Sequence, residues 1–104
     1  MLNKDKLKQI FGYYGELNQI LKLQEEAREL DDSVEDVIVI DGEIGSLSVR
    51  ASSDKDDFIE ELADVYVLIS QFLMQPIYKE KILKIANMKI DRQLKRIKKE
   101  KANE

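Results

Sequence analysis

The sequence predicts an all-α fold, a helical bundle that is completed by dimerisation and carries a short hairpin or loop insertion between two acidic helices. Three observations support this prediction. Apolar residues recur with helical periodicity in three segments, near residues 4–30, 54–75 and 77–101. A β-branched run separates the first two segments. Amphipathic helices with wide apolar faces usually need a partner to complete their core, so we expect an oligomer.

The first segment, residues 4–30, is expected to form one long helix. Glycine weakens a helix interior, so we expect a bend at Gly12 or Gly15, and the polar residues 31–33 are expected to end the helix. The apolar residues that fall mainly on one side, at about 100° per residue, are Leu7, Ile10, Tyr14, Leu17, Ile20, Leu21, Ala27 and Leu30.

An insertion of different character follows, within residues 36–50. It contains the β-branched run Val37–Ile40, the turn dipeptide Asp41-Gly42 and the short alternating stretch Leu47–Val49. This order of a run, a turn and a second stretch predicts a small hairpin or an ordered loop.

The remaining two helices have recognisable starts. Ser52 or Ser53 can cap the first of them, and its acidic first turn is favoured at the positive end of a helix dipole. We expect this helix to end near Gln75. Pro76 is the only proline, and it fits a break followed by the first turn of a last helix, which we expect from Ile77 to about Lys101.

Length and composition indicate one globular domain, residues 1–104. Apolar residues make up 43% and charged residues 37% of the chain, which is too apolar for a disordered chain and too charged for a membrane span. No run approaches the roughly 18 apolar residues of a spanning helix, and the first residues lack the apolar region of a secretory signal. We therefore expect a cytoplasmic protein with no membrane partner.

The residue types restrict the chemistry. The chain has no cysteine and no histidine, which excludes a disulfide, a thiolate nucleophile, an imidazole base and a Cys/His zinc site. Carboxylate oxygens suit hard cations, magnesium or manganese. The net charge of −4 is unevenly spread, because residues 89–104 carry seven basic and three acidic side chains. The body is therefore acidic and the last helix basic.

One carboxylate lies where an apolar residue is expected. On a helical wheel Glu61 falls between Leu68 and Phe72, inside the apolar face, while Asp64 lies at its edge and Glu60 points away. Residues three apart are neighbours on a helix, so Glu61 and Asp64 can share one ligand. An ionised carboxylate among apolar residues must be paired, hydrogen-bonded or bound to a metal.

The first helix supplies a second acidic pair, Glu26 and Glu29. If the two helices pack antiparallel, these two carboxylates converge with Glu61 and Asp64, and such a cluster needs one or two divalent cations. Two other interpretations stay open: a solvated acidic helix face, or a salt bridge from Glu61 to a basic residue of the last helix. Those basic residues are Lys89 and Arg92.

Three motifs follow one another along the chain. They are Tyr14-Gly15-Glu16, Asn18-Gln19, Lys22-Leu23 and Glu25-Glu26-Ala27-Arg28-Glu29-Leu30 in the first, Glu60-Glu61-Leu62-Ala63-Asp64-Val65 in the second, and Asn87-Met88-Lys89-Ile90-Asp91-Arg92 with Arg96 in the third. In this order they resemble the motifs of MazG-like, all-α nucleoside triphosphate pyrophosphohydrolases, notably the small phage and bacterial types. The resemblance covers residues 13–30, 58–75 and 85–97, about half of the chain.

The resemblance implies magnesium-dependent hydrolysis of a nucleoside or deoxynucleoside triphosphate to the monophosphate and pyrophosphate, by a homodimer or homotetramer. It implies that Glu25 positions or deprotonates the attacking water. Gln19 lies one heptad before Glu26 on the same side and is one candidate for reading a ribose or base edge. The sequence does not rank it against the aromatic residues that could contact the base, which are Phe11, Tyr13, Tyr14, Tyr66 and Tyr78. The residues implied to bind metal are Glu26, Glu29, Glu61 and Asp64, and those implied to hold the phosphates or sugar are Asn87, Lys89 and Arg92.

The chain departs from the family pattern between the two acidic pairs. Thirty-one residues separate Glu29 from Glu61, more than is usual, and the insertion at 36–50 leaves the substrate open. It could be a housekeeping substrate, a phosphoribosyl-ATP or a signalling nucleotide. A non-enzymatic alternative is a helical dimerisation or regulatory module that binds nucleic acid through its basic last helix. The sequence pI of about 5.0 and the absence of aromatic residues in the basic tail disfavour that alternative.

Overall fold

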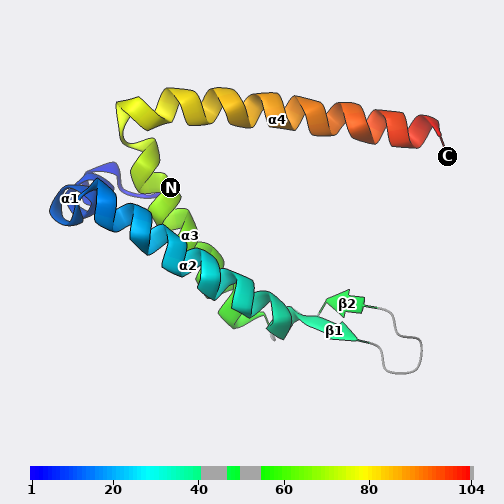
Figure 1. Ribbon diagram of the computed structural model, residues 1–104, viewed down its shortest axis with the longest axis horizontal. Helices are drawn as coiled ribbons and strands as arrows, with labels where there is room; N and C mark the ends of the chain where they lie inside the picture. The colour runs from blue at the N-terminus through cyan, green and yellow to red at the C-terminus, as the bar shows by residue number, and fades with distance from the viewer. Residues whose placement is uncertain (41–46, 50–54, 104) are drawn as a thin grey trace. The chain divides into compact units, whose positions relative to one another are not determined.

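The computed structural model describes residues 1–40, 47–49 and 55–103. These residues are mainly helical, as the sequence predicts (Figure 1). The chain divides into two compact units, Met1–Gln71 and Phe72–Glu104. The elements, in chain order, are α1 (Lys4–Tyr14), α2 (Glu16–Val37), β1 (Ile38–Ile40), β2 (Leu47–Val49), α3 (Asp56–Leu73) and α4 (Pro76–Ala102).

Gly15 divides the first predicted helix into α1 and α2. Its φ of 86° lies in the left-handed region, which glycine adopts without the steric cost of a Cβ atom. Its N–H donates to the carbonyl of Phe11 at 2.8 Å, which closes the last turn of α1. The predicted bend is thus at Gly15 and is a complete break between two helices, whereas Gly12 lies inside α1.

The expected end of this helix at residues 31–33 is wrong, because α2 continues to Val37. The Ser33 hydroxyl donates to the carbonyl of Leu30 at 2.7 Å, so the serine bonds back within the helix and does not end it. Val37 is buried, so the extra turn adds apolar contact to the first unit. The strand therefore begins at Ile38, one residue later than predicted.

The insertion forms a two-stranded antiparallel sheet. β1 pairs with β2, with Ile38 opposite Val49 and Ile40 opposite Leu47. This agrees with the hairpin that the sequence predicts. The Asp41-Gly42 turn and the proposed caps Ser52 and Ser53 lie outside the described residues.

The break between α3 and α4 lies where the single proline predicts it. α3 ends at Leu73, two residues before the predicted end, and Pro76 is the first residue of α4. Gln75 has an extended backbone, as is usual for a residue before proline, and its N–H donates to the carbonyl of Phe72 at 3.0 Å. In this second unit the rings of Phe72 and Tyr78 meet edge to face, with centroids 5.1 Å apart.

The face of α2 that is buried is not the apolar face that the sequence predicts. Gln19, Glu26 and Ser33, spaced seven residues apart, are buried, whereas Leu17 and Leu21 are 69% and 54% exposed. Periodicity identifies the apolar side of the helix, but not whether its own chain or a partner covers that side. Here the polar side chains of Gln19, Glu26 and Ser33 are buried in the first unit, and an apolar row of α2 that includes Leu17 and Leu21 stays exposed.

Candidate metal centre

The candidate site lies between α2 and α3, which run side by side in opposite directions (Figure 1). Near one end of the contact the amide of Gln19 donates to Oε1 of Gln71 at 2.7 Å. One heptad along each helix, Glu26 of α2 meets Asp64 of α3. This is the antiparallel arrangement that the convergence of the acidic pairs requires.

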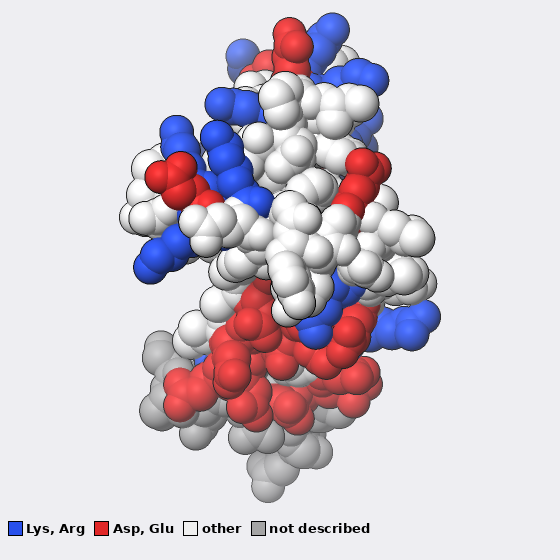
Figure 2. Space-filling model, turned by 90° about the vertical axis from the view of Figure 1, so that its left-hand side faces the viewer, with Lys and Arg blue, Asp and Glu red and all other residues white. Residues whose placement is uncertain are grey.

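All four residues of the two predicted acidic pairs come together. One carboxylate oxygen from each of them lies within 4.8 Å of the others. The cluster combines residues three apart on each helix, which share a face. In Figure 2, Asp and Glu side chains gather in one broad area of the visible surface. The members of the cluster are Glu26, Glu29, Glu61 and Asp64.

Two oxygens of the cluster are buried and have no hydrogen-bond partner, Oε2 of Glu26 and Oε2 of Glu61. Glu26 is only 6% exposed. A buried carboxylate oxygen without a donor loses its hydration and gains no hydrogen bond in return. The arrangement is therefore unfavourable unless a cation or a proton occupies the space between the carboxylates.

Lys22 supplies part of the missing charge. Its Nζ lies 3.1 Å from Oε1 of Glu26 and 3.4 Å from Oε2 of Glu25, and these carboxylates raise the pKa of the lysine. A single ammonium cannot balance four carboxylates. The lysine also contacts Glu26 through Oε1, which leaves Oε2 unsatisfied.

Two carboxylates of the cluster, Glu61 and Glu29, have raised pKa values. Burial raises the pKa of Glu61, and the negative charges of Asp64 and Glu26 raise it further. The pKa of Glu29 is raised because its protonated carboxyl can donate a hydrogen bond to Glu26, and because Glu26 repels its charged form. Glu61 and Glu29 thus bind protons more tightly than ordinary carboxylates, as expected where like charges are held close together.

The donor set fits a hard divalent cation. Magnesium prefers oxygen ligands at roughly 2.0–2.1 Å, so two oxygens on opposite sides of the ion are about 4.2 Å apart. The 4.8 Å spread of the four oxygens is close to this, and small side-chain rotations would close the difference. Manganese uses the same ligand type. The side chains of the cluster could hold one or two such ions.

Glu25 does not join the cluster. Its side chain is 58% exposed and pairs with Lys22. The structure therefore places the predicted water-activating residue next to the four carboxylates in sequence but not among them.

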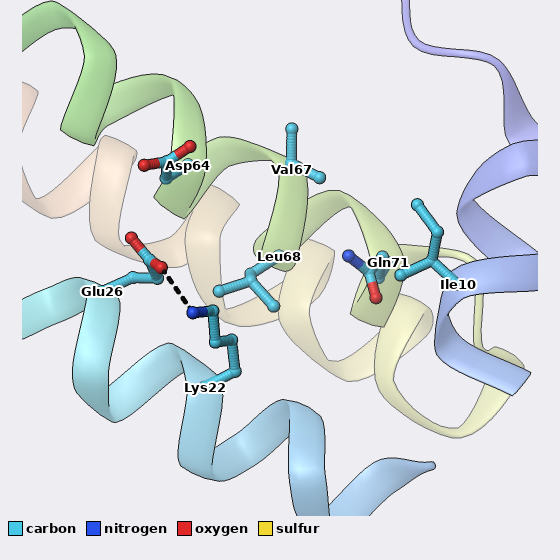
Figure 3. A pocket seen from close by; sticks show the side chains of 7 residues that line it. All are labelled: Ile10, Lys22, Glu26, Asp64, Val67, Leu68 and Gln71. Carbon is cyan, nitrogen blue, oxygen red and sulfur yellow. Dashed lines mark ion pairs between the residues drawn. The ribbon is translucent and has the colours of Figure 1, made fainter. Parts of the chain in front are cut away.

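A pocket that sequence reasoning missed adjoins the cluster (Figure 3). Its volume is about 210 Å³. Gln71 belongs to its lining and is almost completely buried, at 1% exposure, as the partner of Gln19. The sequence spacing could have indicated that Gln71 lies near Gln19. Gln71 follows Asp64 by one heptad on α3, Gln19 precedes Glu26 by one heptad on α2, and the two helices are antiparallel. The lining residues are Ile10, Lys22, Glu26, Asp64, Val67, Leu68 and Gln71.

The three predicted phosphate or sugar ligands, Asn87, Lys89 and Arg92, lie on α4 in the second unit, and all three are exposed. Lys89 and Arg92 line one pocket of about 260 Å³ together with Ile85 and Met88. An arginine fork and a lysine ammonium one turn apart suit a phosphate chain.

Comparisons with family models, with curated proteins and with solved structures found no match for this chain. Among the described residues, no helix is both long enough and apolar enough to span a bilayer.

Proposed function

We propose that this chain is a metal-dependent nucleoside triphosphate pyrophosphohydrolase of the MazG-like type. Water would add across the bond between the α and β phosphates, giving the nucleoside monophosphate and pyrophosphate. The observation that carries the proposal is the pair of buried, unpartnered oxygens on Glu26 and Glu61 inside a four-carboxylate cluster. The order of the three motifs in the sequence supports the same assignment.

The side chains have distinct roles in this proposal. Glu26, Glu29, Glu61 and Asp64 would hold magnesium or manganese. A bound ion would neutralise phosphate charge and lower the pKa of a bound water. Glu25 would position or deprotonate the attacking water. Its exposed carboxylate would first have to leave Lys22, 3.4 Å away.

The remaining roles concern the substrate. Lys89 and Arg92 would balance the charge of the pyrophosphate leaving group, and Asn87 would hold a phosphate or the sugar. Gln19 would read a ribose or base edge. We also propose a homodimer or homotetramer, because the first unit exposes apolar residues in rows on two helices. These residues are Leu17, Ile20 and Leu21 on α2 and Leu62, Tyr66 and Ile69 on α3.

A nucleotide panel with magnesium or manganese tests the activity. Pyrophosphate release should be measured for the common ribo- and deoxyribonucleoside triphosphates, including dCTP and dUTP, and for oxidised and deaminated purine nucleotides. Glu61→Gln should abolish turnover. Glu60→Gln is the matched control, because Glu60 is the adjacent, exposed glutamate on the same helix. Absence of turnover across the whole panel would contradict the proposal.

The alternative, nucleic-acid binding through α4, makes the opposite prediction. A nucleic-acid binder would retain its affinity in Glu61→Gln and lose it when the basic residues near the end of α4 are replaced. These residues include Lys95, Arg96, Lys98 and Lys99.

A further inference from the structure

The pocket beside the acidic cluster has a graded lining (Figure 3). Glu26 and Asp64, which belong to the cluster, lie at one end, and Gln71 and Ile10 lie at the other. Lys22 stands at the acidic end, paired with Glu26, and Val67 and Leu68 lie between. The lining therefore changes from carboxylates and a cation to apolar side chains, and at the far end to an amide beside the apolar Ile10.

The same order of chemistry runs along a metal-bound nucleotide. Its phosphates need a metal and a cation, its sugar and base faces are less polar, and the base edge offers hydrogen-bond donors and acceptors. The amide end of the pocket lies seven residues from the cluster along α3, which is roughly 10 Å at 1.5 Å per residue. An extended nucleotide needs a separation of this order between its α phosphate and the far edge of its base.

We infer that this pocket is the nucleoside subsite of the enzyme, and that the buried pair Gln19–Gln71 determines which base it accepts. The inference rests on the proposed function and adds a specificity-determining residue, Gln71. At about 210 Å³ the pocket is smaller than the roughly 300–1,000 Å³ of sites that take a whole drug-sized ligand. It therefore holds part of the nucleotide, while the triphosphate lies over the carboxylates.

The buried pair Gln19–Gln71 is well suited to distinguish one nucleotide base from another. An amide carries both donors and an acceptor, and the 2.7 Å bond from Gln19 to Oε1 of Gln71 fixes how the Gln71 side chain is oriented. Both residues are buried, at 4% and 1% exposure, so water cannot easily replace a missing partner. A site of this kind rejects a ligand that leaves its polar groups unpaired far more strongly than an apolar site rejects a ligand of the wrong size.

A purely structural role for the pair is the competing explanation. It is distinguished by following the side-chain amide resonances of Gln19 and Gln71 by NMR in the full chain with magnesium. The probes are non-hydrolysable α,β-imido triphosphates of each base and inorganic tripolyphosphate, which has phosphates but no base. We expect the nucleotide of the preferred base to shift both amide resonances, and tripolyphosphate to bind without shifting them.

Base preference provides the second measurement. The double variant Gln19→Leu/Gln71→Leu removes both amides together, so neither is left unpaired, and Ser70→Ala is the control at a buried neighbour outside the pocket lining. We expect the ratio of kcat/KM between the preferred base and the next to fall by about tenfold or more in the double variant and to stay unchanged in the control. Nucleotide binding without amide shifts, together with an unchanged ratio in the double variant, would overturn the inference and leave the proposed function standing. Failure of every nucleotide and of tripolyphosphate to bind would overturn both.

Discussion

The ammonium of Lys22 lies 3.1 Å from one carboxylate oxygen of Glu26, while the other oxygen of the same carboxylate is buried without a partner. The two oxygens of one side chain thus have different environments. One pairs with the cation at the pocket, and the other is a buried oxygen of a side chain that belongs to the four-carboxylate cluster. Lys22 and a bound metal ion would both interact with the carboxylate of Glu26, and their positive charges would repel each other. The lysine should therefore weaken metal binding.

Removing the lysine should therefore strengthen metal binding. In Lys22→Met we expect the Kd of magnesium, measured by calorimetry without nucleotide, to fall about threefold to tenfold. The reason is that a positive charge close to the site is lost, and the partly exposed position of Lys22 keeps the effect modest. Lys8→Met, at an exposed lysine of α1, is the control and should leave the Kd unchanged. Weaker magnesium binding in Lys22→Met would show that the lysine does not compete with the ion.

Glu25 and Glu29 should behave differently although both belong to the same motif. Glu29→Gln should weaken magnesium binding about tenfold or more, because Glu29 contributes one of the four converging carboxylates. Glu25→Gln should retain magnesium binding and lower kcat about a hundredfold, as expected for loss of a general base. Calorimetry and pyrophosphate release measure the two effects. Normal turnover in Glu25→Gln would remove Glu25 from the mechanism.

The raised pKa of Glu61 predicts a pH-dependent stability in the absence of metal. The folded chain holds this proton more tightly than the unfolded chain, where the pKa is near its ordinary value of 4.5. The resulting stabilisation is complete below about pH 4.5 and is lost as the pH rises through the higher folded pKa. Burial is the main cause, and repulsion from Asp64 and Glu26 adds to it.

Urea unfolding between pH 4.5 and 7.5 measures this contribution. Other carboxylates titrate as well, so the relevant quantity is the difference between the native chain and Glu61→Gln. Without metal, the free energy of unfolding of the native chain should fall relative to Glu61→Gln as the pH rises. Magnesium should reverse the trend, because it binds the deprotonated carboxylates. A difference that does not change with pH would mean that Glu61 is not desolvated.

The acidic cluster could be predicted because its signal is local. Glu61 interrupts an apolar helix face, and the spacing of three residues that joins it to Asp64 also joins Glu26 to Glu29. Antiparallel packing was then the single tertiary assumption, and α2 and α3 satisfy it. The break at Pro76 was equally local, because proline cannot continue a helix from the preceding turn.

The buried row of α2 could not be predicted from periodicity. A hydrophobic pattern shows which side of a helix avoids water, but it does not show whether its own chain or a partner covers that side. Gln19 and Ser33 are therefore buried, while Leu17 is exposed. Gln71 was missed for a related reason, because an amide on an apolar helix is usually a surface residue until a second buried amide, Gln19, provides its partner.

Two glycines of the first unit make a matched pair for stability. Gly15→Ala should destabilise the chain by about 1 kcal/mol or more, because alanine is strained at a φ of 86°. Gly12→Ala should stabilise it by roughly 0.5–1 kcal/mol, because Gly12 lies inside α1 and an added Cβ would meet no atom within 4 Å. Thermal unfolding compares the two variants. Effects of the same sign would contradict the role assigned to the backbone at Gly15.

The exposed apolar row of α2 predicts self-association. Leu21→Glu should raise the Kd of the oligomer about tenfold or more, because a carboxylate would lose its hydration in an apolar interface. Gln9→Glu adds the same charge at an exposed position of α1 and should leave the oligomer intact. Sedimentation velocity over a range of concentrations measures both. A native chain that sediments as a monomer throughout would contradict the proposed oligomer. If the native chain does associate but Leu21→Glu leaves the oligomer unchanged, the contact between copies lies on another surface than the apolar row of α2.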